Sequence, residues 1–277
     1  MTRQAPPKPL VKVPCTASVG GVFRRGERTV PEETAIAFTY DRCAHAVMMA
    51  TPVDLEDFAV GFSLSEGIIS APDEITQLEI VTDDLGIELR MSLAEGRMEH
   101  WIERRRYLAG PTGCGICGIE SLEEAMRPSA IVNTELHVTP EAISSAMELL
   151  SKSQPLNRES RAIHAAGFWT PARGLVAVRE DVGRHNALDK LAGALAQAGV
   201  PRGAGIVLLT SRVSIEMVQK TARLGTPILV AVSAPTALAV RTAEAAGITL
   251  IAVARGRDFE IFTRPERIEY DRALNVA

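Results

Sequence analysis

The stretch that decides the fold is Gly205–Ala254, which reads GIVLLTSRVSIEMVQKTARLGTPILVAVSAPTALAVRTAEAAGITLIAVA. Three short apolar runs alternate with two longer amphipathic segments, in the order Gly205–Thr210, Ser211–Leu224, Pro227–Val232, Thr236–Ala246 and Ile248–Ala254. Apolar runs of strand length favour buried strands, and the segments between them favour helices. This alternation predicts an α/β fold with a mainly parallel sheet and flanking helices.

The preceding residues extend the same pattern. The runs Arg161–Thr170 and Gly174–Arg179 are β-like, and Asn186–Ala198 is helical. A further helix is expected from Thr139, which is a good N-cap, to about Ser151. The polar stretch Ser153–Arg161 is expected to be a loop. We assign residues 110–277 to one α/β domain.

The N-terminal part predicts a smaller α+β unit over residues 21–109. Its β-like runs are Thr34–Tyr40, Ala44–Thr51, Ile75–Thr82 and Gly86–Leu93. One helix is expected from the capping residue Asp54 to about Ile69, and another over Gly96–Tyr107. Residues 1–20 are rich in Pro and small side chains, which predicts a flexible lead-in.

Composition excludes several classes of protein. The 277 residues carry 30 Lys and Arg against 34 Asp and Glu, a net charge of −4. A mildly acidic chain has no general attraction for nucleic acid or an anionic membrane. No apolar run approaches the length of a membrane-spanning helix. Four cysteines are too few for a disulfide scaffold, so we expect a cytoplasmic protein.

The predicted sheet indicates where a ligand would bind. In open α/β sheets, ligands bind beyond the carboxyl ends of the strands, where helix N-termini attract anions. The polar and cationic residues expected at these ends are Ser211, Arg212, Ser233, Thr236, Arg255 and Arg257. They favour a phosphate or nucleotide site. The alternative is that they are ordinary helix caps and surface arginines.

A second polar cluster, Glu180–Asn186, lies between a predicted strand and a predicted helix. Arg184 and His185 are candidates to line the same cleft. The alternative is that Asn186 or Asp181 merely caps the helix, and that His185, near a helix start, is a hydrogen-bonded surface residue. His164 lies in an apolar run and is expected in the core or the cleft.

Cys114 and Cys117 form a C-x-x-C pair inside the glycine-rich segment Ala109–Gly118. A single pair cannot complete a tetrahedral zinc site, and the chain lacks the H-x-E signature of zinc deaminases, so no structural metal is expected. Two interpretations remain from the residues alone. One is a redox dithiol, and the other is a thiolate that carries a group such as persulfide sulfur between sites.

Four segments together resemble one known family. They are Gly61–Gly67 (GFSLSEG), Thr112–Gly118 (TGCGICG), Glu180–Lys190 (EDVGRHNALDK) and Ser211–Lys220 (SRVSIEMVQK). The chain resembles the formate dehydrogenase accessory sulfurtransferases (FdhD) from about residue 20 to residue 268. The resemblance implies a cytidine-deaminase-like fold without zinc chemistry, and a homodimer. It also implies transfer of persulfide sulfur from a cysteine desulfurase to molybdenum bound by bis(molybdopterin guanine dinucleotide), for formate dehydrogenase.

The resemblance also implies roles for particular residues. Cys114 matches the persulfide-carrying cysteine, and Cys117 fills the second position of the motif. The cofactor-binding segment falls on Val253, Ala254, Arg255, Gly256, Arg257 and Asp258, with Val253 where the family often has an aromatic. GDP is the expected mimic of the bound cofactor. The rival functions are a thiol–disulfide oxidoreductase and a non-catalytic molybdenum-cofactor-binding chaperone.

Overall fold

The computed structural model describes residues 5–96 and 129–269. Within them, the larger sheet has six strands in the order β12-β11-β10-β9-β7-β8. The strands are β7 (His164–Thr170), β8 (Gly174–Asp181), β9 (Ile206–Leu209), β10 (Ile228–Ala231), β11 (Thr249–Arg255) and β12 (Asp258–Ile261). These strands confirm the α/β class and the order of elements predicted for the C-terminal half.

The strand directions create one edge at which several carboxyl ends meet. Strands β9, β10 and β11 pair in parallel, whereas β7 is antiparallel to both β8 and β9. Strand β8 therefore runs in the same direction as β9 to β11, and β12 returns antiparallel to β11. The sheet has a parallel centre with antiparallel strands beside it. The carboxyl ends of β8, β9, β10 and β11 share one edge with the start of β7.

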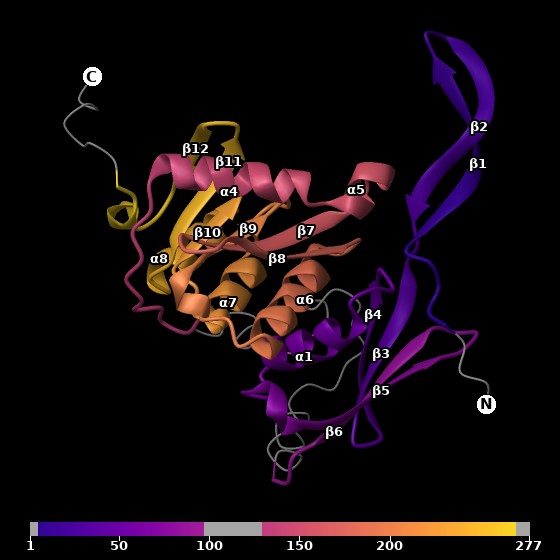
Figure 1. Cartoon of the computed structure of the whole chain (residues 1–277), viewed down its shortest axis with the longest axis horizontal. Coiled ribbons are helices and arrows are strands. Elements are labelled where there is room, and N and C mark those ends of the chain that lie inside the picture. Colours follow the sequence, from indigo (N-terminus) through magenta and orange to yellow (C-terminus); the bar gives the residue numbers. More distant parts are fainter. Residues whose placement is uncertain (1–4, 97–128, 270–277) are drawn as a thin grey trace.

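Helices cover both faces of this sheet (Figure 1). Helix α4 (Pro140–Lys152) lies on one face, and α6 (Arg184–Gln197), α7 (Ile215–Leu224) and α8 (Ala237–Ala245) lie on the other. Side chains alternate accordingly: Ile228 and Val230 pack with α4, and Leu229 packs with α6 to α8. Thr139 caps α4 as expected, because its hydroxyl accepts a hydrogen bond from the Ala142 amide at 3.2 Å.

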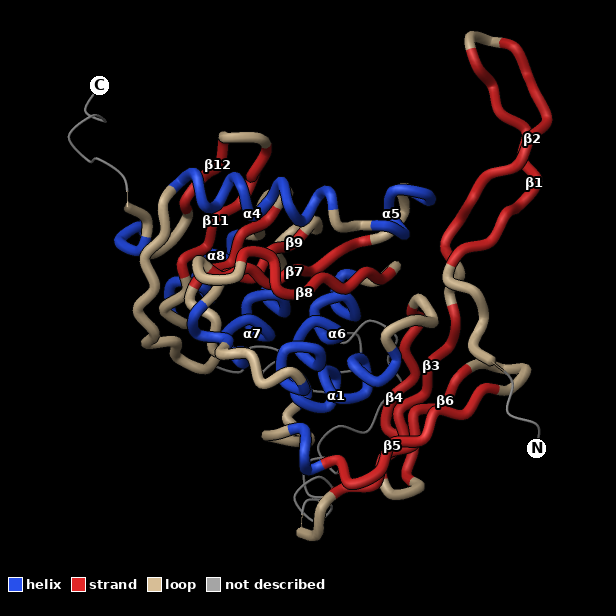
Figure 2. Tube along the Cα trace, in the orientation of Figure 1, coloured by secondary structure: helices blue, strands red, loops and turns tan. Residues whose placement is uncertain are grey.

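The N-terminal unit has its own sheet, in the order β4-β3-β6-β5. Its strands are β3 (Thr34–Tyr40), β4 (Cys43–Ala50), β5 (Ile75–Thr82) and β6 (Ile87–Leu93), and its helix is α1 (Leu55–Glu66). Helix α1 lies between this sheet and α6 (Figure 2). A Cβ on Gly61 would meet the Asp189 carbonyl oxygen at 1.7 Å, so only glycine permits the close approach of α1 to α6. The two units therefore share an interface.

The expectation for residues 1–20 is wrong from Leu10 onward. Strand β1 (Leu10–Val19) pairs with β2 (Val22–Pro31) in a ribbon that extends away from the rest of the molecule (Figure 1). Gly20 and Gly21 have φ angles of +60° and +82° and form the two-residue turn that joins the strands. The boundary placed between residues 20 and 21 falls within this turn and does not separate two parts.

Two local expectations are also wrong. The stretch expected as a loop, Ser153–Arg161, contains helix α5 (Pro155–Ser160). The Glu180 carboxylate accepts the amides of Leu156 and Asn157 at 2.9 and 2.8 Å, and this distant partner stabilises a short helix of polar sequence. Asp54 makes no side-chain cap of α1 and has a left-handed backbone. The helix expected over Gly96–Tyr107 lies, apart from Gly96, outside the described residues.

Candidate functional site

A cavity of about 710 Å³ opens beside the carboxyl ends of β10 and β11. One wall is the turn between β11 and β12, formed by Arg255, Gly256 and Arg257. Another wall is a face of α4 that carries Glu141, Ser144, Ser145, Glu148 and Ser151. The volume is in the range of small-molecule sites, and the position is the one expected for a ligand of an open α/β sheet.

A bulge in β11 directs this segment toward the cavity. The pairing of β11 with β12 shifts register between Ala252 and Arg255, and Val253 has a φ of +55°. Ala252 and Val253 consequently both pack on the side of α6 to α8, whereas Ala254 packs on the α4 side. A β-branched residue rarely adopts a positive φ, so the backbone is strained next to the cavity. Without the bulge, each side chain after Val253 would point to the other face of the sheet.

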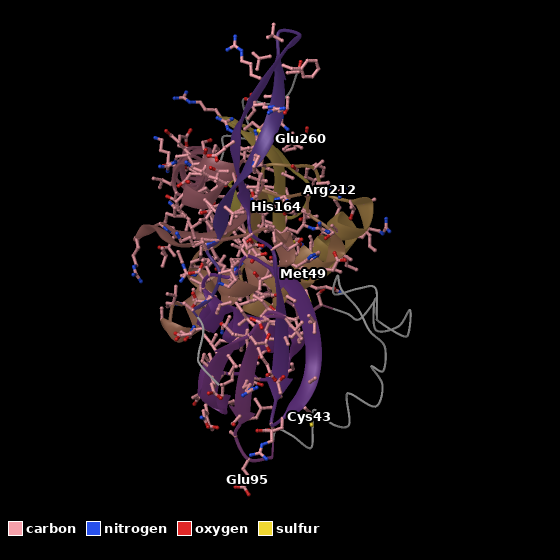
Figure 3. All side chains as sticks on the ribbon, turned by 90° about the vertical axis from the view of Figure 1, so that its right-hand side faces the viewer. Cys43, Met49, Glu95, His164, Arg212 and Glu260 are labelled. Atoms are coloured by element: carbon pink, nitrogen blue, oxygen red, sulfur yellow. The ribbon has the colours of Figure 1, made fainter. Side chains whose placement is uncertain are left out.

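The other residues predicted at the strand ends lie along the same edge but do not line this cavity. Ser211 is buried, and its hydroxyl donates to the Arg212 carbonyl oxygen at 3.0 Å. Thr236 caps α8 by accepting the Ala239 amide at 3.1 Å, which is the ordinary role weighed for it. Ser233 is half-buried, and Arg212 and Asp258 are exposed. Arg212 and His164 appear near the centre of the view in Figure 3, above Met49 of β4.

Arg184 and His185 begin α6 and form a second polar cluster at this edge. The His185 Nε2 lies 4.0 Å from the Glu216 Oε2, in the first turn of α7. Burial alone would raise the pKa of Glu216, but the neighbouring donors of His185 and Ser214 outweigh it and lower that pKa to about 2. Burial and the nearby Arg184 cation lower the pKa of His164. The cluster therefore places a carboxylate and two imidazoles near a guanidinium.

Other residues of the Glu180–Lys190 motif hold the two units together. The Asp181 carboxylate is fully buried and lies 2.6 Å from the Lys190 Nζ, which is also fully buried. Asp181 also accepts the Thr51 amide at 3.0 Å, and Lys190 donates to the Thr51 carbonyl oxygen at 2.8 Å. The Asn186 side chain donates to the Met49 carbonyl oxygen at 2.9 Å. These bonds connect β8 and α6 to the end of β4.

The chain's cysteines fall into two groups. Cys114 and Cys117 lie outside the described residues, as does the whole glycine-rich segment Ala109–Gly118. Cys15 in β1 and Cys43 in β4 are free and partly buried. Among residues 5–96 and 129–269, no group of three or more His, Cys, Asp and Glu side chains is arranged to hold a metal ion.

The α4 wall of the cavity is the feature that sequence reasoning missed. Its polar residues recur at the three- and four-residue spacing that places side chains on one helix face. The same pattern is typical of a solvated helix surface, so the spacing does not by itself distinguish a cavity wall from an ordinary surface.

No helix within the described part of the chain combines the length and apolar character needed to cross a membrane.

The fold and the cavity define an α/β protein with two arginines at one edge of its larger sheet, and comparisons with known proteins define the class further. Residues 31–269 match the FdhD/NarQ family, and the chain belongs to it. The sulfur carrier protein FdhD of Agrobacterium fabrum is 55% identical over 260 residues, which are 93% of this chain and 95% of that protein. The sulfur carrier protein FdhD of Cupriavidus necator is 48% identical over 258 residues, covering 91% and 89% of the two chains.

A solved structure supports the same assignment. The crystal structure of a candidate formate dehydrogenase accessory protein from Desulfotalea psychrophila superposes with a TM-score of 0.72 at 26% identity. The match covers 94% of this chain and 99% of that one. The resemblance noted from the four sequence motifs is thereby confirmed at the level of the family and the fold.

Proposed function

We propose that the chain is a sulfur carrier, and specifically a sulfurtransferase, that serves formate dehydrogenase. It accepts sulfur from a cysteine desulfurase on Cys114 and passes it to the bis(molybdopterin guanine dinucleotide) cofactor. Family membership and the names of the relatives support the sulfur-carrier role. The proposal includes a homodimer in the cytoplasm, where the free Cys15 and Cys43 stay reduced.

The cavity beside β11 carries the cofactor part of the proposal. Arg255 and Arg257 are exposed on the β11–β12 turn, and neither forms an ion pair or side-chain hydrogen bond within the described residues. Guanidinium groups bind phosphate oxygens through paired hydrogen bonds. The pyrophosphate of a dinucleotide cofactor is thus suited to this turn.

The proposed transfer conserves atoms and electrons. The Cys114 thiolate attacks the outer sulfur of the desulfurase persulfide, the S–S bond breaks, and the desulfurase cysteine leaves as a thiolate. Release of that sulfur as sulfide then needs two electrons. The Cys117 thiolate supplies them by attacking the inner sulfur of the Cys114 persulfide, which forms a Cys114–Cys117 disulfide and releases the outer sulfur as hydrosulfide. A thiol reductant regenerates the pair.

Complementation of a strain that lacks the native protein tests this function. The wild-type chain restores formate dehydrogenase activity, whereas Cys114→Ala does not. The paired substitution Arg255→Gln/Arg257→Gln also fails, although its Cys114 still accepts sulfur. Activation that survives Cys114→Ala but is lost in the arginine variant would overturn the carrier role in favour of a cofactor-binding chaperone. Cys15→Ala is the matched control and retains full activation.

A further inference from the structure

The ribbon formed by β1 and β2 exposes apolar side chains at its tip. Val19, Val22 and Phe23 lie at the turn that joins the two strands, and their exposed fractions are 66%, 55% and 76%. The tip points away from both sheets (Figure 1), and every residue from Thr16 to Arg28 is exposed. An isolated two-stranded ribbon is only marginally stable in water, so an apolar tip in this position indicates a partner outside the chain.

Two arginines lie directly behind the tip, one on each face of the ribbon. Arg24 and Arg25 follow Phe23 in β2, and successive residues of a strand point to opposite faces. Within the described residues, neither guanidinium forms an ion pair or a hydrogen bond. The apolar side chains are divided in the same way, because Val19 and Val22 are paired on one face and Phe23 lies on the other. Each face therefore has an apolar end followed by a cation.

This arrangement matches the surface of an anionic membrane. A lipid surface surrounds an inserted tip and accepts apolar side chains from both of its faces, whereas a flat protein surface contacts one face. A strand rises about 3.3 Å per residue, so Arg25 lies about 10 Å behind Val22. Apolar side chains of interfacial segments penetrate about 5–10 Å, and that depth places the guanidinium groups at the level of the lipid phosphates.

The charge of the ribbon is opposite to that of the rest of the chain. Lys12, Arg24, Arg25 and Arg28 against Glu27 give residues 10–31 a net charge of +3, which leaves −7 on the other residues of a chain of −4. Anionic lipids attract the ribbon and repel the remainder. The strands are ten residues long and hold the tip about 30 Å from their base, well beyond the Debye length of about 8–10 Å, so this repulsion is screened.

We propose that the tip of the ribbon binds anionic membrane surfaces. Val19, Val22 and Phe23 enter the interface, and Arg24 and Arg25 bind lipid phosphates. Three small apolar contacts and two cations give weak, reversible binding, with a partition constant on the order of 10⁴ M⁻¹, similar to that of a single lipid chain. The net charge of the whole chain excludes a general attraction to such a membrane, but not this local one.

Co-sedimentation of the full-length protein with vesicles tests the proposal. Vesicles of equal parts phosphatidylglycerol and phosphatidylcholine are expected to bind wild type at least about tenfold more strongly than vesicles of phosphatidylcholine alone. Val22→Ser/Phe23→Ser should lower the partition constant for the mixed vesicles about tenfold or more, because it removes apolar area from the interface. Arg24→Gln/Arg25→Gln should lower it about twentyfold, and about 0.5 M salt should have a similar effect on wild type.

Two control variants separate the tip from other exposed apolar residues. Leu85→Ser removes a side chain that is 90% exposed outside the ribbon, and it should leave vesicle binding unchanged. Val13→Ser removes a 36% exposed side chain that lies about 20 Å from Val19 along β1, and it should also bind like wild type. The substituted side chains at the tip are exposed, so the melting temperatures of the tip variants should match that of wild type.

The outcomes distinguish a membrane from a protein partner. Equal binding of wild type to both kinds of vesicle, or to neither, would overturn the proposal. A second copy packed along the ribbon would instead depend on Val13, so dissociation of an oligomer by Val13→Ser in sedimentation velocity, with vesicle binding unaffected by the tip variants, would also overturn it. Sulfur acceptance by Cys114 in solution should be unchanged in all these variants, so the membrane proposal and the proposed function stand or fail independently.

Discussion

Replacement of Lys190 by methionine tests how the two units are joined. Lys190 and Asp181 are both fully buried, with 2.6 Å between the Nζ and the Oδ2. In Lys190→Met, the Asp181 carboxylate keeps the amides of Thr51 and Gly183 and the Asn186 side chain as donors, but it loses its counter-charge. The Thr51 carbonyl oxygen also loses its donor. An uncompensated buried charge costs about 3–5 kcal/mol, so the free energy of unfolding should fall by that amount.

Urea denaturation and thermal melting measure this loss. For a chain of this length, a loss of that size lowers the melting temperature by about 10 °C. The double variant Asp181→Asn/Lys190→Met is the control, since it removes both charges, and it should be less destabilised than the sum of the single variants. A loss below about 1 kcal/mol in Lys190→Met would refute the view that this pair holds the two units together.

Three further predictions concern packing, pH and the phosphate site. Gly61→Ala should lose about 3 kcal/mol or more of stability, measured by urea denaturation, because its Cβ would collide with α6. Gly26→Ala is the control and should match wild type, because a Cβ there would meet no atom within 4 Å. The lowered pKa of Glu216 stabilises the fold above pH 4.5 and loses this contribution as the pH falls toward 2. Between pH 4.5 and pH 2, the free energy of unfolding of Glu216→Gln should therefore fall by about 2 kcal/mol less than that of wild type. An unchanged pH profile of stability would contradict this role. Arg255→Gln/Arg257→Gln should weaken GDP binding about a hundredfold, measured by calorimetry, with the melting temperature unchanged. A GDP affinity equal to that of wild type would show that these arginines do not bind the phosphates.

The strands of the larger sheet, and so the positions of their ends, could be predicted because they depend on short stretches of neighbouring residues. Buried parallel strands need continuous apolar runs, and Gly205–Ala254 shows three of them between amphipathic helices. The direction of those strands then determines the edge at which a ligand is expected, and Arg255 and Arg257 do line a cavity there. The β1–β2 ribbon also had a local signal, since Gly20-Gly21 lies between β-prone runs, but the prolines nearby favoured an irregular segment.

The remaining features depend on contacts between residues far apart in sequence. The polar stripe of α4 becomes a cavity wall only because that helix packs beside β11, and Glu141 looks like a surface residue until then. The bulge at Val253 arises from pairing with β12. Lys190 is buried because Asp181 and Thr51 meet it from β8 and from the end of β4, and a lysine is otherwise expected at the surface.

Mapping of transferred sulfur tests the central claim most directly. The full-length protein is incubated with a cysteine desulfurase and radiolabelled cysteine, and the labelled peptide is identified by mass spectrometry without reductant. One additional sulfur atom is expected on the peptide that contains Cys114 in Cys117→Ala, which cannot release it, and no label is expected in Cys114→Ala/Cys117→Ala. Label retained by the double variant at the level of Cys117→Ala would contradict the carrier role of Cys114.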